Sequence, residues 1–112
     1  MTEIGRVIQE SVPGKQITML HVIASPIDDI YEALGIESIG AIGILTLSPY
    51  ESAIIAADVA TKSADVSIGF LDRFTGSVVL TGDVQSVKIA LHGVAQFLEN
   101  TLNFTVCDVT LS

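Results

Sequence analysis

The stretch SADVSIGFLDRFTGSVVLTGD, residues 63–83, decides the fold of this chain of 112 residues. Its two runs of β-branched and apolar residues, 66–71 and 77–82, predict two strands. The charged and aromatic connector at 72–76 lies between them, and we expect a turn there. Asp83 follows the second strand and stands directly before an apolar stripe at helical spacing, so it predicts the start of a helix.

Three helices are expected from their start signals. The helix after Asp83 covers 84–100, and its apolar stripe consists of Val84, Val87, Leu91, Val94 and Leu98. The sequence Ser48-Pro49-Tyr50-Glu51 is typical of a capping box, with Ser48 as the N-cap of a helix over 51–64. Ser25 stands in a similar signal before a shorter helix that ends at Gly35.

Further strands are predicted over 16–24, 41–47 and 103–111. From residue 41 the order is strand, helix, strand, strand, helix, which is one strand short of a ferredoxin-like unit. The pattern leaves open whether 103–111 or 16–24 supplies the closing strand. Residues 6–12 are more polar, so we expect an exposed strand there, or one that pairs with a partner chain. The fold class is therefore α+β, with helices packed on an antiparallel sheet.

The composition suggests that much of the surface is hidden against other chains. The chain is 49% hydrophobic and 16% charged, with a mean hydropathy of +0.61, whereas a soluble domain usually carries about 25% charged residues. No apolar run of about 18 residues is present, so we expect no transmembrane helix, and with 5 Lys and Arg residues we expect no membrane-surface partner either. The formal net charge of −8 disfavours nucleic acid as a partner, because proteins that bind nucleic acid usually present a basic patch.

The sequence offers only weak candidates for catalytic or metal-binding residues. His21 and His92 have no paired ligand spacing, and we interpret both as structural. Cys107 has no local group to lower the pKa of its thiol, so a small buried hydrophobe is the expectation. No phosphate-binding glycine loop is present. We therefore expect no catalytic residues, no metal and no cofactor, and the single cysteine favours a reducing cytosolic location.

Three segments carry a resemblance to a known family. They are AIGILTL with ESAIIAADVATKSADV (41–47 and 51–66), GSVVLTGDVQSVKIAL (76–91) and LHVIASPIDDIYEAL (20–34). They are similar to parts of the shell-protein domain of bacterial microcompartments, the BMC domain. The last segment usually follows the other two but precedes them here, so the domain looks circularly permuted, which close termini tolerate. With RVIQESVPGKQ (6–16) and GFLDRFTG (69–76), this order resembles the EutS/PduU type of ethanolamine and propanediol utilisation.

The resemblance implies a structural role. Residues 15–112 are then a permuted BMC domain derived from the ferredoxin-like fold, and 1–14 are an N-terminal extension. Such proteins form homohexamers that tile with other shell proteins around encapsulated enzymes, in a compartment shell within the cytoplasm. They have no chemistry of their own. The rival reading is a small ferredoxin-like oligomer that binds a regulatory metabolite, because a fold alone permits both.

The resemblance also implies roles for particular residues. Asp72, Arg73, Phe74 and Thr75 would line the pore at the six-fold axis, where Asp72 and Arg73 of neighbours could pair. The alternative is an ordinary solvated turn. Strands from six chains, made of Arg6, Val7, Ile8, Gln9 and Glu10, would form a small barrel over the pore. The alternative there is a disordered tail.

Two more positions concern tiling and ring shape. Lys62 would contact the neighbouring hexamer at the edge, although a solvated lysine at a helix end is a close alternative. In the family, a motif at the hexamer edge usually contains an arginine. The matching residues here, Ser25-Pro26-Ile27, contain none, which weakens the case for strong tiling. Gly40 permits a backbone bend that a β-branched residue would resist, so the hexamer is expected to be bent or flexible there.

Overall fold

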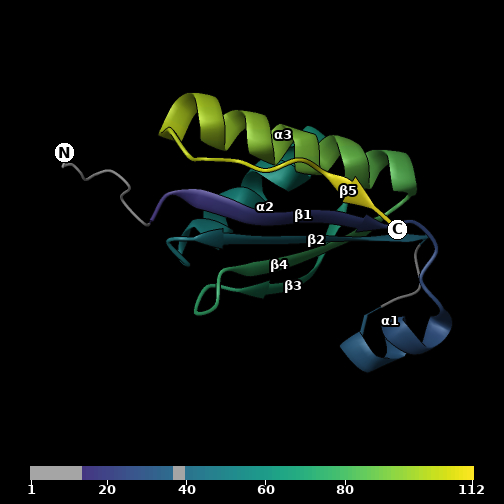
Figure 1. The fold of residues 1–112 in the computed structure, drawn as a ribbon. Coiled ribbons are helices and arrows are strands. Elements are labelled where there is room, and N and C mark those ends of the chain that lie inside the picture. The colour runs from purple at the N-terminus through teal and green to yellow at the C-terminus, as the bar shows by residue number, and fades with distance from the viewer. Residues whose placement is uncertain (1–13, 37–39) are drawn as a thin grey trace.

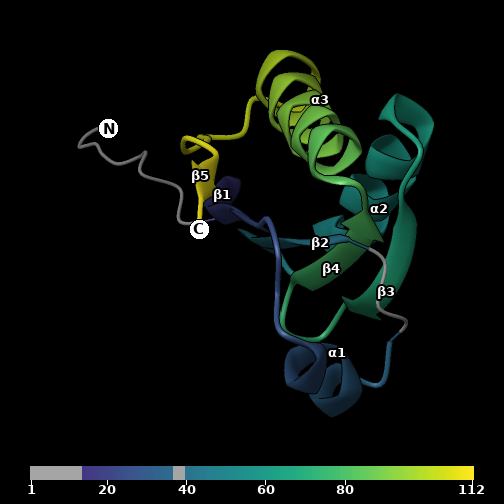
Figure 2. The ribbon, with the colours of Figure 1, turned by 90° about the vertical axis from the view of Figure 1, so that its right-hand side faces the viewer.

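The computed structural model describes residues 14–36 and 40–112, which form a five-stranded sheet and three helices. The elements are β1 (Gln16–Ile23), α1 (Asp28–Leu34), β2 (Ala41–Ser48), α2 (Ser52–Ser63), β3 (Ser67–Asp72), β4 (Ser77–Gly82), α3 (Val84–Leu102) and β5 (Thr110–Leu111). Helices α2 and α3 cover one face of the sheet, and α1 projects from the opposite side at one end (Figures 1 and 2). The expected α+β class is confirmed.

The strand order is β3-β4-β2-β1-β5. Strand β1 pairs with β2, β2 with β4, and β4 with β3, all antiparallel. Strand β5 joins the outer edge of β1 in parallel. The open question about the closing strand is thus answered, because β1 completes the ferredoxin-like unit and comes first in the chain.

The strand expected over 103–111 is largely wrong. Only Thr110 and Leu111 form a strand, and Thr105 makes an isolated bridge to Gln16. The reason lies in the packing between them, because Val106 and its direct neighbour Cys107 are both half-buried against the core. Successive residues of a strand point to opposite faces, so this segment gives up the strand conformation to bury both side chains.

The core lies between α2, α3 and the sheet. In α3 the expected stripe is buried at Val87, Leu91, Val94 and Leu98, whereas Val84 is only partly covered. Four alanines of α2 are also buried: Ala53, Ala56, Ala57 and Ala60. These small residues allow α2 to pack closely against α3. Full burial of each leucine contributes about 1.5–3 kcal/mol.

Only one of the three expected helix caps is present. The side chain of Asp83 accepts a 2.8 Å hydrogen bond from the N–H of Ser86 and caps α3. Ser48 is not a cap, because β2 continues to Ser48 and a separate turn of residues 49–51 precedes α2. Ser25 is not a cap either, because α1 starts after Ile27 without a side-chain cap.

The second face of the sheet is covered only in part. The buried side chain of Tyr31 in α1 donates a 2.8 Å hydrogen bond to the carbonyl oxygen of Gly40, which fixes α1 over one end. Away from α1, the large apolar side chains Met19 and Phe70 are exposed on this face. In the described part of the chain, no helix is apolar and long enough to span a membrane.

Candidate functional site

The connector between β3 and β4 is a turn held by Asp72. Its Oδ1 accepts a 2.8 Å hydrogen bond from the N–H of Phe74, and its Oδ2 accepts a 2.9 Å bond from the hydroxyl of Thr75. These bonds lower the pKa of Asp72, with the Phe74 N–H as the larger cause and the Thr75 hydroxyl as the second. Because both carboxylate oxygens are engaged, Asp72 stabilises its own turn.

The same turn requires a glycine at its end. Gly76 has a φ of 74°, in the left-handed region, and its N–H donates to the carbonyl oxygen of Asp72 at 2.9 Å. A side chain there would collide with the carbonyl oxygen of Leu47 and contact Tyr50. The connector is therefore a defined structure packed against the end of β2.

Arg73 and Phe74 are both exposed side chains of the connector. The guanidinium carbon of Arg73 lies 4.9 Å from the centre of the Phe74 ring, at the distance of a cation–π pair. Phe74 is 73% exposed, which is unusual for a phenylalanine. Together with Leu71 and Ile54, which are 40% and 49% exposed, they line a groove of about 260 Å³. Asp72 also lines this groove, so its lining combines two charged residues with three apolar side chains that the described residues leave exposed.

The start of the described domain lies at the same end of the sheet as the connector. Gln16, the first residue of β1, pairs with Ser48 at the end of β2, and the N–H of Leu47 donates to Gly76 at 2.9 Å. Figure 1 shows the β3–β4 turn and the beginning of β1 at this end. The expected barrel residues, Arg6, Val7, Ile8, Gln9 and Glu10, lie outside the described residues.

Lys62 lies in the last turn of α2. Its Nζ is 2.8 Å from Oδ2 of Asp58, one helical turn earlier, and both side chains are largely exposed. An exposed pair of this kind stabilises a helix by about 0.3–0.5 kcal/mol. Lys62 is therefore held on the helix surface and accessible, which is compatible with both of its expected roles.

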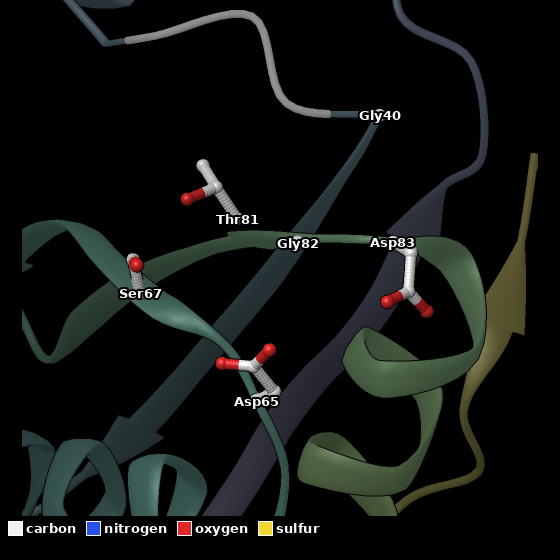
Figure 3. A pocket seen from close by; sticks show the side chains of 6 residues that line it. All are labelled: Gly40, Asp65, Ser67, Thr81, Gly82 and Asp83. Atoms are coloured by element: carbon white, nitrogen blue, oxygen red, sulfur yellow. The ribbon is translucent and has the colours of Figure 1, made fainter.

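Gly40 lies beside a polar pocket of about 490 Å³ (Figure 3). Its φ is 81°, and an added side chain would approach the carbonyl oxygen of Gly82 to 3.1 Å. Asp65 and Asp83 also line this pocket, together with Ser67 and the buried Thr81. The two carboxylates do not make a metal site, because Asp83 is engaged as the cap of α3.

Neither His21 nor His92 belongs to a cluster of possible metal ligands. The described residues contain no group of three or more His, Cys, Asp or Glu side chains that could hold a metal ion. His92 lies exposed on α3. The ring of His21 has two partners that the sequence did not reveal, because Thr110 and Ser112 are about 90 residues away along the chain.

Exposed apolar side chains occur on most elements of the domain. The large ones are Met19, Ile27, Ile30, Leu34, Tyr50, Ile54, Ile55, Ile68, Phe70, Leu71, Phe74, Ile89, Phe97 and Leu111. Scattered apolar residues are normal on a protein surface, but a contiguous groove such as the one beside Phe74 indicates an interaction site. The composition predicted that much of the surface is hidden against other chains, and these exposed side chains are available for such contacts.

Comparison with known proteins identifies the family. The BMC domain model matches residues 41–110. The chain belongs to the BMC-domain family. It is 54% identical over 110 residues to the microcompartment shell protein CutR of Streptococcus intermedius, covering 98% of this chain and 95% of CutR. It is 56% identical to the shell protein PduU of Salmonella typhimurium, over 94% of this chain and 91% of PduU. The shell protein EutS of Escherichia coli is 50% identical over 96% of both chains.

Solved structures agree with this assignment. A flat CutR hexamer superimposes with a TM-score of 0.87 at 54% identity, covering 96% of this chain and 99% of that chain. A screw-shaped CutR assembly has a TM-score of 0.85 at 51% identity, covering 89% and 100%. The expected EutS/PduU type is confirmed, as is the shell location at the level of the family. The BMC-domain relatives favour the shell over the metabolite-binding rival.

Proposed function

We propose that this BMC-domain chain is a structural subunit of a bacterial microcompartment shell and forms a closed ring of six copies. The observation that carries this is the pair of exposed apolar side chains Ile54 and Leu71 in the groove beside the connector. A heterologous contact that closes into a ring would cover such a groove in every copy. The subunit has no chemistry of its own, and other shell proteins and the enclosed enzymes are its partners.

In this ring the connector faces the six-fold axis. Arg73 and Phe74 then line the opening, and Asp72 supports them from within its own turn instead of pairing with a neighbour. This assignment is supported by the exposure of Phe74 and by the engagement of both carboxylate oxygens of Asp72. Thr75 contributes its hydroxyl to the same support.

A barrel of N-terminal strands caps the pore. The support for this is positional, because β1 starts at the same end of the sheet as the connector. If six connectors surround one axis, six extensions begin near that axis as well. Six short strands from residues 6–10 can close a narrow barrel filled by side chains, which removes their exposed edges.

Neighbouring rings carry the same sign of net charge, so tiling has to overcome the electrostatic repulsion between them. Six copies carry a formal charge of −48, six times the −8 of one chain. Local contacts at the edge, among them those of Lys62, therefore hold neighbouring rings together. Gly40 is the point at which the ring bends, and CutR, which forms both flat and screw-shaped assemblies, is a precedent for such variation.

Native mass spectrometry of the purified protein tests the ring. We expect six copies per particle for the wild type and a loss of the hexamer for Leu71→Asp, because an aspartate in the groove opposes burial. Ile89→Asp is the matched control, because it places the same charge on an exposed isoleucine of α3, outside the groove. A wild-type monomer, or a Leu71→Asp variant that still forms hexamers, would contradict the proposed ring.

Cysteine crosslinking tests the barrel separately. In a Cys107→Ser background, which removes the one native cysteine, Ile8→Cys places a thiol on each extension. Oxidation should then link neighbouring chains within an intact hexamer. A hexamer without such links would reject the barrel and leave the ring standing.

A further inference from the structure

Helix α1 is attached to the sheet through Tyr31 and Ile36. Tyr31 is the one buried side chain of α1, and its hydroxyl donates a 2.8 Å hydrogen bond to the carbonyl oxygen of Gly40. Ile36, just beyond the helix, is half-buried beside β3, where a Cβ added at Gly69 would lie 3.2 Å from its Cγ2 atom. Figure 2 shows α1 on the side of the sheet opposite α2 and α3. Among the side chains of α1 itself, Tyr31 is therefore the one that holds the helix in place.

The backbone that this hydrogen bond constrains is that of Gly40, directly before β2. Its φ of 81° lies in the left-handed region, and an isolated bridge joins it to Gly82 at the end of β4. A glycine adopts positive and negative φ about equally readily, so the residue itself does not select this conformation. The acceptor is the carbonyl oxygen of Gly40, so a rotation of the Gly40 backbone moves it away from the Tyr31 hydroxyl. The hydrogen bond therefore favours one conformation of Gly40 over the others.

The Tyr31 hydroxyl is well suited to hold this acceptor. The Tyr31 residue is only 3% exposed, so its ring has a fixed place against the sheet. Burial raises the pKa of Tyr31 above its usual value, and the negative charge of Asp28 raises it further. The hydroxyl thus keeps its proton at neutral pH and remains a donor. A buried tyrosine usually places its O–H against a partner, and here the partner is a backbone carbonyl at the start of a strand.

We propose that Tyr31 is the positioning residue of the bend at Gly40 and thereby selects the shape of the ring. With the hydrogen bond in place, Gly40 has one conformation and α1 has one position against the sheet. Without it, Gly40 samples further conformations, and the population of ring shapes becomes broader. This inference rests on the bend proposed above at Gly40 and adds the residue that controls it.

Hydrogen exchange of the full-length chain, followed by mass spectrometry, tests the coupling without reference to ring shape. Tyr31→Phe keeps the buried ring and removes only the hydroxyl. We expect the amides of Gly35 and Ile36, which bond back to α1, to exchange about fivefold faster, because the helix loses a hydrogen bond to the sheet. In a Gly40→Val background the same substitution should add little, because valine leaves the left-handed conformation and already displaces the acceptor. Unchanged exchange in Tyr31→Phe, or an equal increase in both backgrounds, would overturn the coupling.

Electron microscopy of the assembled rings tests the effect on shape. We expect a broader distribution of ring shapes for Tyr31→Phe than for the wild type. Ile36→Ala is the matched control, because it weakens the other attachment of α1 and leaves the Tyr31 hydroxyl in place. An unaltered distribution in Tyr31→Phe, or an equal change in Ile36→Ala, would overturn the role of Tyr31. An unaltered ring in Gly40→Val contradicts the bend itself, whereas an altered ring in Gly40→Val beside an unaltered one in Tyr31→Phe contradicts only the control by Tyr31.

Discussion

The Oδ1 atom of Asp72 accepts a 2.8 Å hydrogen bond from the backbone N–H of Phe74, two residues later in the chain. This contact links the most exposed aromatic side chain of the described domain to a carboxylate inside its own turn. The exposure of Phe74 is thus imposed by a rigid backbone, because Thr75 engages the other carboxylate oxygen and Gly76 closes the turn.

Replacement of Asp72 is expected to loosen the connector without unfolding the domain. In Asp72→Ala the Phe74 amide should exchange about tenfold faster, because its acceptor is lost. Thr75→Val removes only the bond from the hydroxyl to Oδ2 and should have a smaller effect. Hydrogen exchange measured by NMR on the two variants checks this order, and equal protection of Phe74 in wild type and Asp72→Ala would contradict it.

The cap of α3 makes stability depend on pH in the acidic range. The pKa of Asp83 is lowered from 3.8, first by the N–H of Ser86 and then by its hydroxyl. A carboxylate with a lowered pKa stabilises the folded state above its unfolded pKa, and this contribution is lost as pH falls through the folded value. The thermal midpoint should therefore decrease as pH falls below about 4.

The substitution Asp83→Asn keeps a side-chain cap on α3 but removes the negative charge. Asparagine is also a good N-cap but does not titrate, so the variant should lose less stability than wild type between about pH 5 and pH 3. The rest of the slope includes the contribution of Asp72, whose pKa is also lowered. If the thermal midpoints of wild type and Asp83→Asn decrease equally with pH over this range, the cap carries no pH dependence.

The close approach of α2 and α3 is expected to tolerate no side chain at Gly93. An added Cβ there would lie 2.5 Å from Oγ and 2.8 Å from Cβ of Ser63, so the helices must separate. We expect Gly93→Ala to lower the free energy of unfolding by about 1–3 kcal/mol, as overpacking does. Urea unfolding measures this loss. Adding Ser63→Gly should recover part of it, and a double variant no more stable than Gly93→Ala would place the strain elsewhere.

Gly40→Val tests the proposed bend. With a φ of 81°, a valine is strained by about 1–2 kcal/mol, and its Cβ approaches Gly82. We expect electron microscopy to show an altered ring shape. Gly35→Val is the matched control, because Gly35 has a φ of 70° but no atom within 4 Å of an added Cβ. A wild-type ring in Gly40→Val would count against a bend at this glycine.

Local sequence signals predicted those features that form within one segment. The β-branched and apolar runs at 66–71 and 77–82 predicted the β3–β4 pair, and the stripe from Val87 to Leu98 predicted the buried face of α3. Asp83 caps α3 because its partner, Ser86, is only three residues away. The order of the family segments also indicated the permuted fold, which β1 completes by pairing with β2.

Distant contacts decided the rest. Ser48 carries a cap signal, but pairing with Gln16 keeps it in β2. The segment 103–111 has the alternating pattern of a strand, but its successive side chains Val106 and Cys107 both pack against the core. Only Thr110 and Leu111 therefore remain in the sheet. The sequence by itself therefore determined the elements and the family, since these depend on neighbours along the chain. Only the tertiary structure decided that His21 meets the C-terminus and that Phe74 faces outward, because the partners meet only after the sheet has formed.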